Sequence, residues 1–248
     1  MSRLAGKAAL VAGAGGGIGG AVSAALAAAG VSVLGVDRSP EQVPAGDSIF
    51  PHAAELTDEE QVSACVAAAV ARFGRLDIVF NGAGISGRRL GDGRAEEIPL
   101  ETWDTVLAAN LTSTFLVCKH ALPALRESGG GAIVNLSSVL GLVGGDPDFA
   151  THAYAASKGA VVSFTRALAV TYAAEGIACN VVCPSLIATP MSARAQSDPA
   201  IRARLAELQP LTGDFGEPAD VAEAVVYLAG ARFVTGTVLT VDGGWTAR

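Results

Sequence analysis

Tyr154 and Lys158 are four residues apart in the stretch His152-Ala-Tyr-Ala-Ala-Ser-Lys158. If this stretch opens a helix, the phenol and the ammonium group project from the same face. A lone tyrosine has a pKa of about 10 and is a poor acid–base catalyst near neutrality, but a cation within roughly 4–6 Å favours the phenolate. The pair is therefore a candidate proton-transfer device, although a tyrosine beside a solvated lysine would have the same spacing.

A glycine-rich turn lies near the start of the chain, between the apolar run Lys7–Ala12 and the helix-forming run Ala21–Ala29. Its glycines fit G-x-x-x-G-x-G at positions 13, 17 and 19, and also G-x-G-x-x-G at positions 15, 17 and 20. Such a strand, turn and helix can bind a pyrophosphate at the backbone N–H groups and positive end of the helix. The alternative is an ordinary flexible turn.

Asp37 ends the next apolar run, Val31–Val36, and lies 37 − 17 = 20 residues after Gly17. This is the spacing of the acid that hydrogen-bonds a ribose diol in dinucleotide-binding folds. Its charge would repel a 2′-phosphate, so the sequence predicts NAD rather than NADP. Arg38 leaves the alternative open, since a guanidinium can pair with a phosphate or stack on an adenine.

Apolar runs and helical patterns alternate along the rest of the chain. We expect strands at His52–Leu56, Leu76–Phe80, Ala132–Leu136, Ile177–Cys183 and Thr237–Val241. We expect helices at Asp58–Phe73 with Thr57 as N-cap, Leu100–Leu125, His152 to about Glu175, and Pro218–Leu228. This alternation predicts an α/β fold, a single Rossmann-type domain over residues 1–248 with a doubly wound parallel sheet and helices on both faces.

Polar residues follow two of the expected strands, at the sheet edge where open α/β sheets bind ligands. These are the turn Asn81–Gly84 and the hydroxyl of Ser138. The loop after the turn Asn81–Gly84, residues 85–98, carries Arg88, Arg89 and Arg94. It could bind an anionic substrate, but acidic neighbours make a solvated loop the preferred interpretation.

Composition excludes several classes of protein. The chain has 248 residues, 50% of them hydrophobic, which is enough for one large core. With 17 basic and 24 acidic residues its net charge is −7, so we expect no nucleic-acid partner. The four cysteines form no C-x-x-C pair, which predicts buried thiols in a reducing compartment and neither a disulfide set nor a metal site.

The run Ala8–Val36 has no charged residue and follows Arg3 and Lys7, as in a signal peptide or membrane anchor. Glycines interrupt its middle, where a single spanning helix would not place them. Two short apolar elements around a turn explain the run better. We therefore expect a soluble, cytoplasmic protein without a membrane segment.

Taken together, these motifs resemble those of the classical short-chain dehydrogenases/reductases. The motifs that carry the resemblance occur in order over essentially the whole chain: Ala12-Gly13 to Gly19, Asn81-Gly-Ala-Gly84, Asn110, Ser138 before Gly141, Tyr154-x-x-x-Lys158, Asn180 to Pro184, Ile187-Ala-Thr189, and Val241-Asp-Gly-Gly244. The resemblance implies hydride transfer between a secondary alcohol or ketone and NAD. It assigns cofactor contacts to Gly13, Gly15, Gly17, Ile18, Gly19, Asp37, Arg38, Glu55, Leu56, Asn81, Gly82, Ala83, Tyr154, Lys158, Pro184, Ile187 and Thr189.

The resemblance also implies a role for each of four catalytic residues. Tyr154 would move the hydroxyl proton, and Lys158 would lower the pKa of Tyr154 and bond the nicotinamide ribose. Ser138 would donate a hydrogen bond to the substrate oxygen, and Asn110 would hold a water that links Lys158 to solvent. Two alternatives remain: a 3-oxoacyl-carrier reductase that uses NADPH, and a non-catalytic dinucleotide-responsive binding protein.

The family further implies a homotetramer, in line with a helix after His152 that is apolar on more than one face. A substrate lid is expected at about residues 185–212. The pocket is expected to be largely apolar and to take a secondary alcohol or ketone of moderate size rather than a highly charged metabolite. Its expected apolar lining is Leu140, Leu142, Val143, Leu186 and Met191.

Several positions depart from the family pattern. Ala12 replaces a threonine, Gly82 an asparagine and Ser185 a glycine, and Glu55-Leu56 stands where an aspartate and a valine are common. The Ser138 to Tyr154 interval, 154 − 138 = 16 residues, is longer than usual. We therefore expect residues 144–151 to bulge over the substrate and to determine which substrate is accepted.

Overall fold

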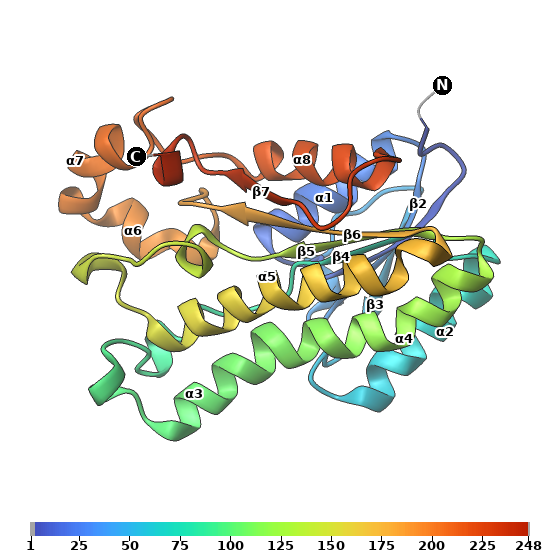
Figure 1. Ribbon diagram of the computed structural model, residues 1–248, viewed down its shortest axis with the longest axis horizontal. Helices are drawn as coiled ribbons and strands as arrows, with labels where there is room; N and C mark the ends of the chain where they lie inside the picture. Colours follow the sequence, from blue (N-terminus) through green and yellow to red (C-terminus); the bar gives the residue numbers. More distant parts are fainter. Residues whose placement is uncertain (1–2, 248) are drawn as a thin grey trace.

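A seven-stranded sheet forms the centre of the computed structural model, which describes residues 3–247 (Figure 1). The strands are β1 (Ala8–Ala12), β2 (Ser32–Asp37), β3 (Ile49–Ala53), β4 (Ile78–Asn81), β5 (Gly131–Leu136), β6 (Ile177–Pro184) and β7 (Val238–Val241). Their order is β3-β2-β1-β4-β5-β6-β7, and every neighbouring pair is parallel. The order reverses between β1 and β4, which creates a crevice at the carboxyl edge of the sheet. The predicted doubly wound fold is confirmed.

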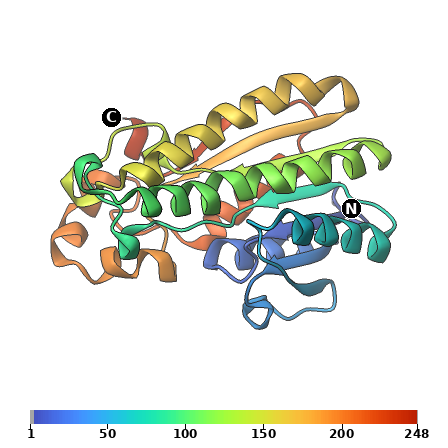
Figure 2. The ribbon, with the colours of Figure 1, turned by 90° about the horizontal axis from the view of Figure 1, so that it is seen from below.

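Helices cover both faces of the sheet (Figures 1 and 2). The helices are α1 (Gly17–Ala28), α2 (Glu59–Phe73), α3 (Leu100–Leu107), α4 (Ser113–Glu127), α5 (His152–Tyr172), α6 (Ala193–Ser197), α7 (Pro199–Leu208) and α8 (Pro218–Gly230). Leu10 and Leu34 pack with α2, α4 and α5, whereas Ala9 and Val33 pack with α1 and α8. The strands are apolar on both sides because helices bury both sides.

Two predicted boundaries are wrong. The third strand covers residues 49–53 rather than 52–56, because it pairs with β2 and ends where β2 ends, at Asp37 opposite Ala53. The N-cap of α2 is Asp58, whose carboxylate accepts hydrogen bonds from the backbone N–H groups of Glu60 and Gln61. Thr57, the predicted cap, donates its hydroxyl to Glu55 instead.

The predicted helix over residues 100–125 is interrupted. A π-helical turn, Ala108–Thr112, separates α3 from α4. Such turns take an extra residue into the helix and are frequent at functional sites. Asn110, at the centre of this turn, is fully buried.

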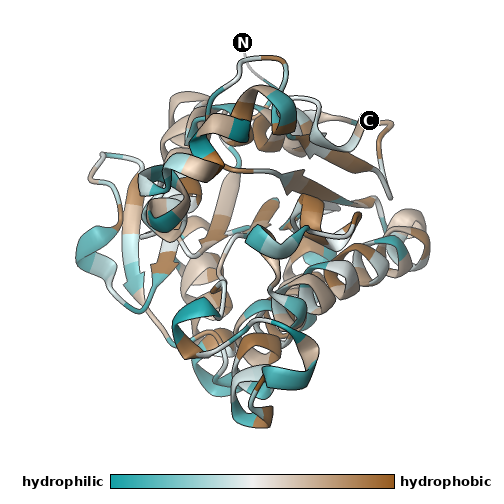
Figure 3. Cartoon of the chain, turned by 90° about the vertical axis from the view of Figure 1, so that its left-hand side faces the viewer, coloured by the Kyte–Doolittle hydropathy of each residue, from teal (hydrophilic) through white to brown (hydrophobic). Residues whose placement is uncertain are grey.

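The segment after β6 contains α6 and α7, beyond the carboxyl edge of the sheet at the left of Figure 1. Figure 3 looks onto this end of the molecule, with hydrophobic colour on the central strands and hydrophilic colour on the outer helices. A small separate core joins α6 and α7 to Val139, Phe149 and Trp245. The predicted lid region therefore packs as two helices on a core of its own, and its mobility stays a prediction.

All four cysteines are buried and free, as the sequence predicted. Burial raises the pKa of the Cys65 thiol to about 11 and that of Cys179 to about 12. Both thiols therefore stay protonated and unreactive at neutral pH. Across residues 3–247, no helix combines the length and apolar character needed to cross a membrane.

Candidate active site

A cavity of about 1140 Å³ lies along the carboxyl edge of the sheet. The residues predicted to bind a dinucleotide line it, with the exception of Asn81. Of the four predicted catalytic residues, Ser138, Tyr154 and Lys158 line it and Asn110 does not. The fold thus brings the glycine turn and the Tyr154–Lys158 pair, more than a hundred residues apart in sequence, into one site.

The glycine turn is closely packed by the segments around it. A Cβ on Gly13 would lie 2.7 Å from the backbone nitrogen of Ala83, and one on Gly19 would lie 2.0 Å from the carbonyl oxygen of Gly13. A Cβ on Gly17 would lie 2.8 Å from the methyl group of Thr189. Side chains at these positions would displace the turn from the neighbouring loops.

The first turn of α1 is suited to an anion. Within the described residues no side chain caps this helix, and its first turn, Gly17 to Gly20, has no acidic residue. Its N–H groups and positive dipole end lie at the cavity. Together with the close packing of the glycines, this arrangement fits the pyrophosphate of a dinucleotide.

Asp37 is held in a fixed position at the end of β2. One carboxylate oxygen accepts a hydrogen bond from the Gly15 N–H at 3.0 Å, and the other accepts one from the Ser39 N–H at 3.1 Å. Arg38 is exposed and lies 3.8 Å from the carboxylate of Glu55. This end of the cavity therefore carries a fixed negative charge beside a cation that is already paired.

Tyr154 and Lys158 occupy the first two turns of α5, and Ser138 follows β5. The Lys158 ammonium lies 5.7 Å from the centre of the Tyr154 ring and donates a hydrogen bond to the Leu136 carbonyl at 2.9 Å. The hydroxyl of Ser138 accepts a hydrogen bond from the Leu140 N–H at 3.2 Å. Ser138 also forms a side-chain hydrogen bond with Tyr154.

Burial opposes charge on both members of the pair. It raises the pKa of Tyr154, and the hydrogen bond with Ser138 only partly offsets this. Burial lowers the pKa of Lys158 to about 8. Desolvation dominates at Tyr154, and the ammonium of Lys158 is directed to the Leu136 carbonyl. The role of Lys158 in lowering the pKa of Tyr154 stays a prediction.

Asn110 lies in the π-helical turn and is not among the residues that line the cavity. Its amide oxygen accepts a hydrogen bond from the Ile85 N–H at 2.7 Å, and its amide nitrogen donates to the Ile85 carbonyl at 3.0 Å and to Ser157 at 2.9 Å. These bonds join the loop after β4 to α5 behind the cavity. The role of Asn110 in holding a water stays a prediction.

Asn81 also lies behind the cavity wall, because its side chain points into the core. Its amide nitrogen donates to Asn135 at 2.8 Å and contacts the sulfur of Cys118 at 3.3 Å. The Asn81 side chain therefore supports the turn after β4, and its contact with a cofactor stays a prediction.

Local packing explains two departures from the family pattern. A Cβ on Gly82 would lie 2.4 Å from the ring of Phe80, so an asparagine would not fit there. Ser185 donates to the amide oxygen of Gln209 at 2.9 Å. This bond ties the loop after β6 to the end of α7, as expected of a residue that stiffens the loop.

Asp92 is a site residue that sequence reasoning missed. Its two carboxylate oxygens accept hydrogen bonds from the N–H groups of Ala153, at 3.0 Å, and Tyr154, at 2.9 Å. The side chain is 4% exposed and caps α5, whereas Thr151 provides no side-chain cap. The cap comes from a loop 62 residues away, so no local sequence signal could have revealed it.

The apolar end of the cavity is partly as predicted. Leu140, Leu186 and Met191 line it, but Leu142 and Val143 do not and are partly exposed. The expected bulge at residues 144–151 is a 3₁₀ turn, Pro147–Phe149. Phe149 and Trp245 line the cavity with their rings 5.2 Å apart in an edge arrangement.

The interpretation of the arginine loop as merely solvated is wrong for Arg88, which is partly buried at the cavity, whereas Arg89 stays exposed. Arg88 and Arg89 line the cavity, and Arg194 of α6 joins them. Arg94 is exposed and pairs with Glu96, as expected. The fold turns one part of the loop inward because Asp92 is anchored to α5.

Comparisons with known proteins agree with this architecture. The family model described as enoyl-(acyl carrier protein) reductase matches residues 13–246. The chain is 37% identical to 2-(R)-hydroxypropyl-CoM dehydrogenase of Xanthobacter autotrophicus, over 97% of this chain and 99% of the relative. It is 39% identical to cis-4-hydroxycyclohexanecarboxylate dehydrogenase of Sinomonas cyclohexanicum, over 97% of each chain.

Among solved structures, a putative short-chain dehydrogenase/reductase from Burkholderia xenovorans matches with a TM-score of 0.92 and 37% identity, covering 100% of this chain and 99% of that one. The chain belongs to the short-chain dehydrogenase/reductase family. Members of this family that act as dehydrogenases use a nicotinamide dinucleotide, and the relatives are named for the oxidation of hydroxy compounds. The chain is therefore an oxidoreductase of alcohols.

Proposed function

We propose that this protein is an NAD(H)-dependent oxidoreductase that interconverts a secondary alcohol and a ketone, with Tyr154 as the acid–base group. The observation that carries the proposal is the joint placement of Ser138, Tyr154 and Lys158 in the cavity that also receives the uncapped end of α1. A bound nicotinamide would supply the hydride acceptor or donor. The chain itself must then bind the alcohol, orient it and move its proton.

The three polar side chains divide these tasks. During reduction the phenol of Tyr154 gives its proton to the substrate oxygen, and during oxidation the phenolate takes the hydroxyl proton. Ser138, within hydrogen-bonding reach of Tyr154, holds the substrate oxygen as charge develops on it. Loss of one such donor costs about 3–4 kcal/mol of transition-state stabilisation. Lys158 places a cation behind the phenol.

The preference for NAD rests on Asp37. Its carboxylate is fixed by two backbone N–H groups at the end of β2, and Arg38 is drawn toward Glu55. A 2′-phosphate would meet the charge of Asp37 at close range, and that repulsion is costly. We propose that the same features disfavour an NADPH-linked acyl reductase.

The assembly and its location form part of the proposal. We place the protein in the cytoplasm as a homotetramer, supported by four buried free thiols and by exposed apolar side chains on two adjacent helices. These side chains are Phe115 on α4 and Val170 on α5, the latter 83% exposed. Apolar groups on a packed helix pair are typical of a subunit interface.

The test is a panel of secondary alcohols and ketones with NAD(H) and NADP(H), followed through the absorbance of the reduced nicotinamide. We expect turnover of some members of the panel and a higher kcat/KM with NADH than with NADPH. Turnover with a preference for NADPH would contradict the interpretation of Asp37. Dinucleotide binding without turnover of any member would support a non-catalytic binding protein instead.

A further inference from the structure

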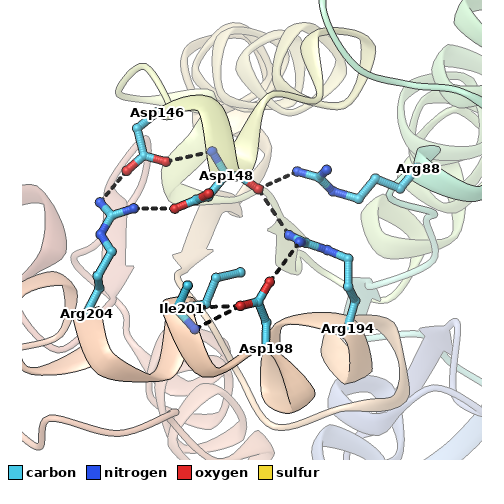
Figure 4. A network of polar contacts seen from close by, with 8 residues as sticks. Arg88, Asp146, Asp148, Arg194, Asp198, Ile201 and Arg204 are labelled. Carbon is cyan, nitrogen blue, oxygen red and sulfur yellow. Dashed lines mark hydrogen bonds and ion pairs between the residues drawn. The ribbon is translucent and has the colours of Figure 1, made fainter.

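Three arginines are among the residues that line the cavity: Arg88, Arg89 and Arg194. Arg88 and Arg89 lie in a 3₁₀ turn of the loop after β4, and Arg194 lies in α6. Figure 4 shows Arg88 and Arg194, from two different segments, converging on Asp148. Both donate hydrogen bonds to the carbonyl oxygen of Asp148, at 2.7 and 3.0 Å.

The neighbouring carboxylates are already engaged. Both oxygens of Asp92 accept backbone N–H groups of α5. The carboxylates of Asp146 and Asp148 pair with Arg204 rather than with the arginines of the cavity. Within residues 3–247, no carboxylate lies within ion-pairing distance of Arg88.

Two guanidinium groups therefore converge on this wall of the cavity without a close ion pair on either among the described residues. Arg194 has a loose partner in Asp198, at 3.6 Å, and Arg88 has only a backbone carbonyl. Burial lowers the pKa of Arg88 and the positive charge of Arg194 lowers it further, while the carboxylates of Asp92 and Asp148 offset part of this. Two like charges held toward each other at a cavity are stabilised when an anion binds between them.

The chemistry of the guanidinium group sets the class of ligand. Its planar N–H donors match the paired oxygens of a carboxylate or a similar oxyanion, and such charge-assisted hydrogen bonds are about twice as strong as neutral ones. The rest of the substrate end is apolar, with Leu140, Phe149 and Leu186 among its lining residues. One anionic end on an otherwise apolar alcohol is complementary to both surfaces.

We propose that the substrate of this site is a secondary alcohol, or its ketone, that carries one oxyanion group, and that Arg88 and Arg194 bind this group. The inference rests on the proposed oxidoreductase function and defines its substrate class. It adds one charged subsite to the expected, largely apolar pocket. The anionic group is a carboxylate or a sulfonate, and it lies at the end of the substrate away from the hydroxyl.

The experiment compares matched substrates. 4-Hydroxycyclohexanecarboxylate and other hydroxy-carboxylates are each paired with the corresponding carboxamide, which has a similar size and no charge. We expect the kcat/KM ratio of carboxylate to carboxamide to exceed one by about tenfold, the effect of about 1.5 kcal/mol from one charged hydrogen bond. Because both kcat/KM values are measured on the same enzyme variant, a general loss of activity cancels in their ratio.

Substitutions at both arginines test whether they cause the preference. Arg88→Gln and Arg194→Gln should each lower the ratio about tenfold, and Arg88→Lys should restore part of it, since it keeps the charge but not the planar fork. Arg94→Gln is the matched control, because Arg94 lies in the same loop, faces solvent and pairs with Glu96. It should leave the ratio unchanged.

Two outcomes overturn the inference: a wild-type ratio of one or less, or a ratio that the Arg88 and Arg194 substitutions leave unchanged. Turnover of the carboxamides in either case would uphold the oxidoreductase function and reject the anionic substrate class alone. Dinucleotide binding without turnover of carboxylates or carboxamides would instead reject the function and the inference together. A preference shared by a sulfonate would show that the site recognises the oxyanion rather than the carbonyl carbon.

Discussion

Lys158 is a buried cation with one hydrogen bond, to the Leu136 carbonyl. Burial lowers its pKa from 10.5 to about 8. Between these values the folded protein binds fewer protons than the unfolded chain, so this group makes stability increase with pH. The charged form is therefore a cost to folding below pH 8, and the cost disappears as the pH approaches 10.5.

Lys158→Met should stabilise the protein at pH 7. Removal of the buried charge contributes roughly 3 kcal/mol, less about 1 kcal/mol for the lost hydrogen bond. The gain in the free energy of unfolding, measured by urea denaturation, should shrink as the pH increases from 8 toward 10. Lys119→Met, at a half-exposed site on α4, is the matched control. A gain that is constant with pH would contradict the account of Lys158.

The residues with chemistry were partly predictable from the sequence. Ser138, Tyr154 and Lys158 could be found because their types and spacing are local features of one strand end and one helix. Asp92 and Arg88 could not, because each acts on a partner from another part of the chain. The direction of the Tyr154 pKa shift could not be predicted either, since its largest cause is burial in the folded protein.

At the scale of single elements, the start of α5 depends on one side chain. Asp92 accepts the N–H groups of Ala153 and Tyr154 and brings a negative charge to the positive end of the helix. The same carboxylate thereby fixes the first turn of the helix that carries the phenol. We infer that its removal affects both folding and the position of the acid–base group.

Asp92→Ala should lower the free energy of unfolding by about 1–2 kcal/mol, the usual effect of losing an N-cap. It should also lower kcat, because the backbone of Tyr154 loses its partner. Asp58→Ala removes the N-cap of α2, a helix whose residues do not line the cavity. This control should lose stability and keep kcat. An unchanged kcat in Asp92→Ala would assign Asp92 a purely structural role.

Element types were predictable because apolar runs and helical periodicity alternate, but element ends were not. The register of β3 is set by pairing with β2, a contact between separate segments. The π-helical turn at Ala108–Thr112 coincides with the hydrogen bonds of Asn110 to Ile85 and Ser157. Neither tertiary contact has a signature in the local sequence.

At the scale of the whole molecule, Arg204 of α7 joins two segments that border the cavity. It pairs with both Asp146 and Asp148, which precede the cavity-lining residue Phe149 (Figure 4). The long segment between Ser138 and Tyr154 is thereby attached to the region predicted to act as a lid. The sequence indicated an unusual segment here, but not that it would be anchored by an ion-pair network.

Arg204→Gln should loosen this contact. We expect KM for the alcohol to increase more than kcat falls, since Phe149 lines the cavity without touching the proton-transfer groups. The loss of stability should be modest, about 1 kcal/mol, because the ion pairs are partly exposed. Arg202→Gln, on the same helix with a long 3.9 Å contact to Asp214, is the control. Equal effects of the two substitutions on KM would contradict this interpretation.

The central claim is that Tyr154 moves the proton in an alcohol–ketone interconversion. The most direct measurement is the turnover of Tyr154→Phe with an alcohol that the wild type oxidises, together with its affinity for NADH from fluorescence. We predict that kcat falls below detection while NADH affinity stays nearly unchanged, because only the phenol hydroxyl is removed. Tyr172→Phe, on the same helix outside the cavity, should remain active. Substantial turnover by Tyr154→Phe would contradict the account.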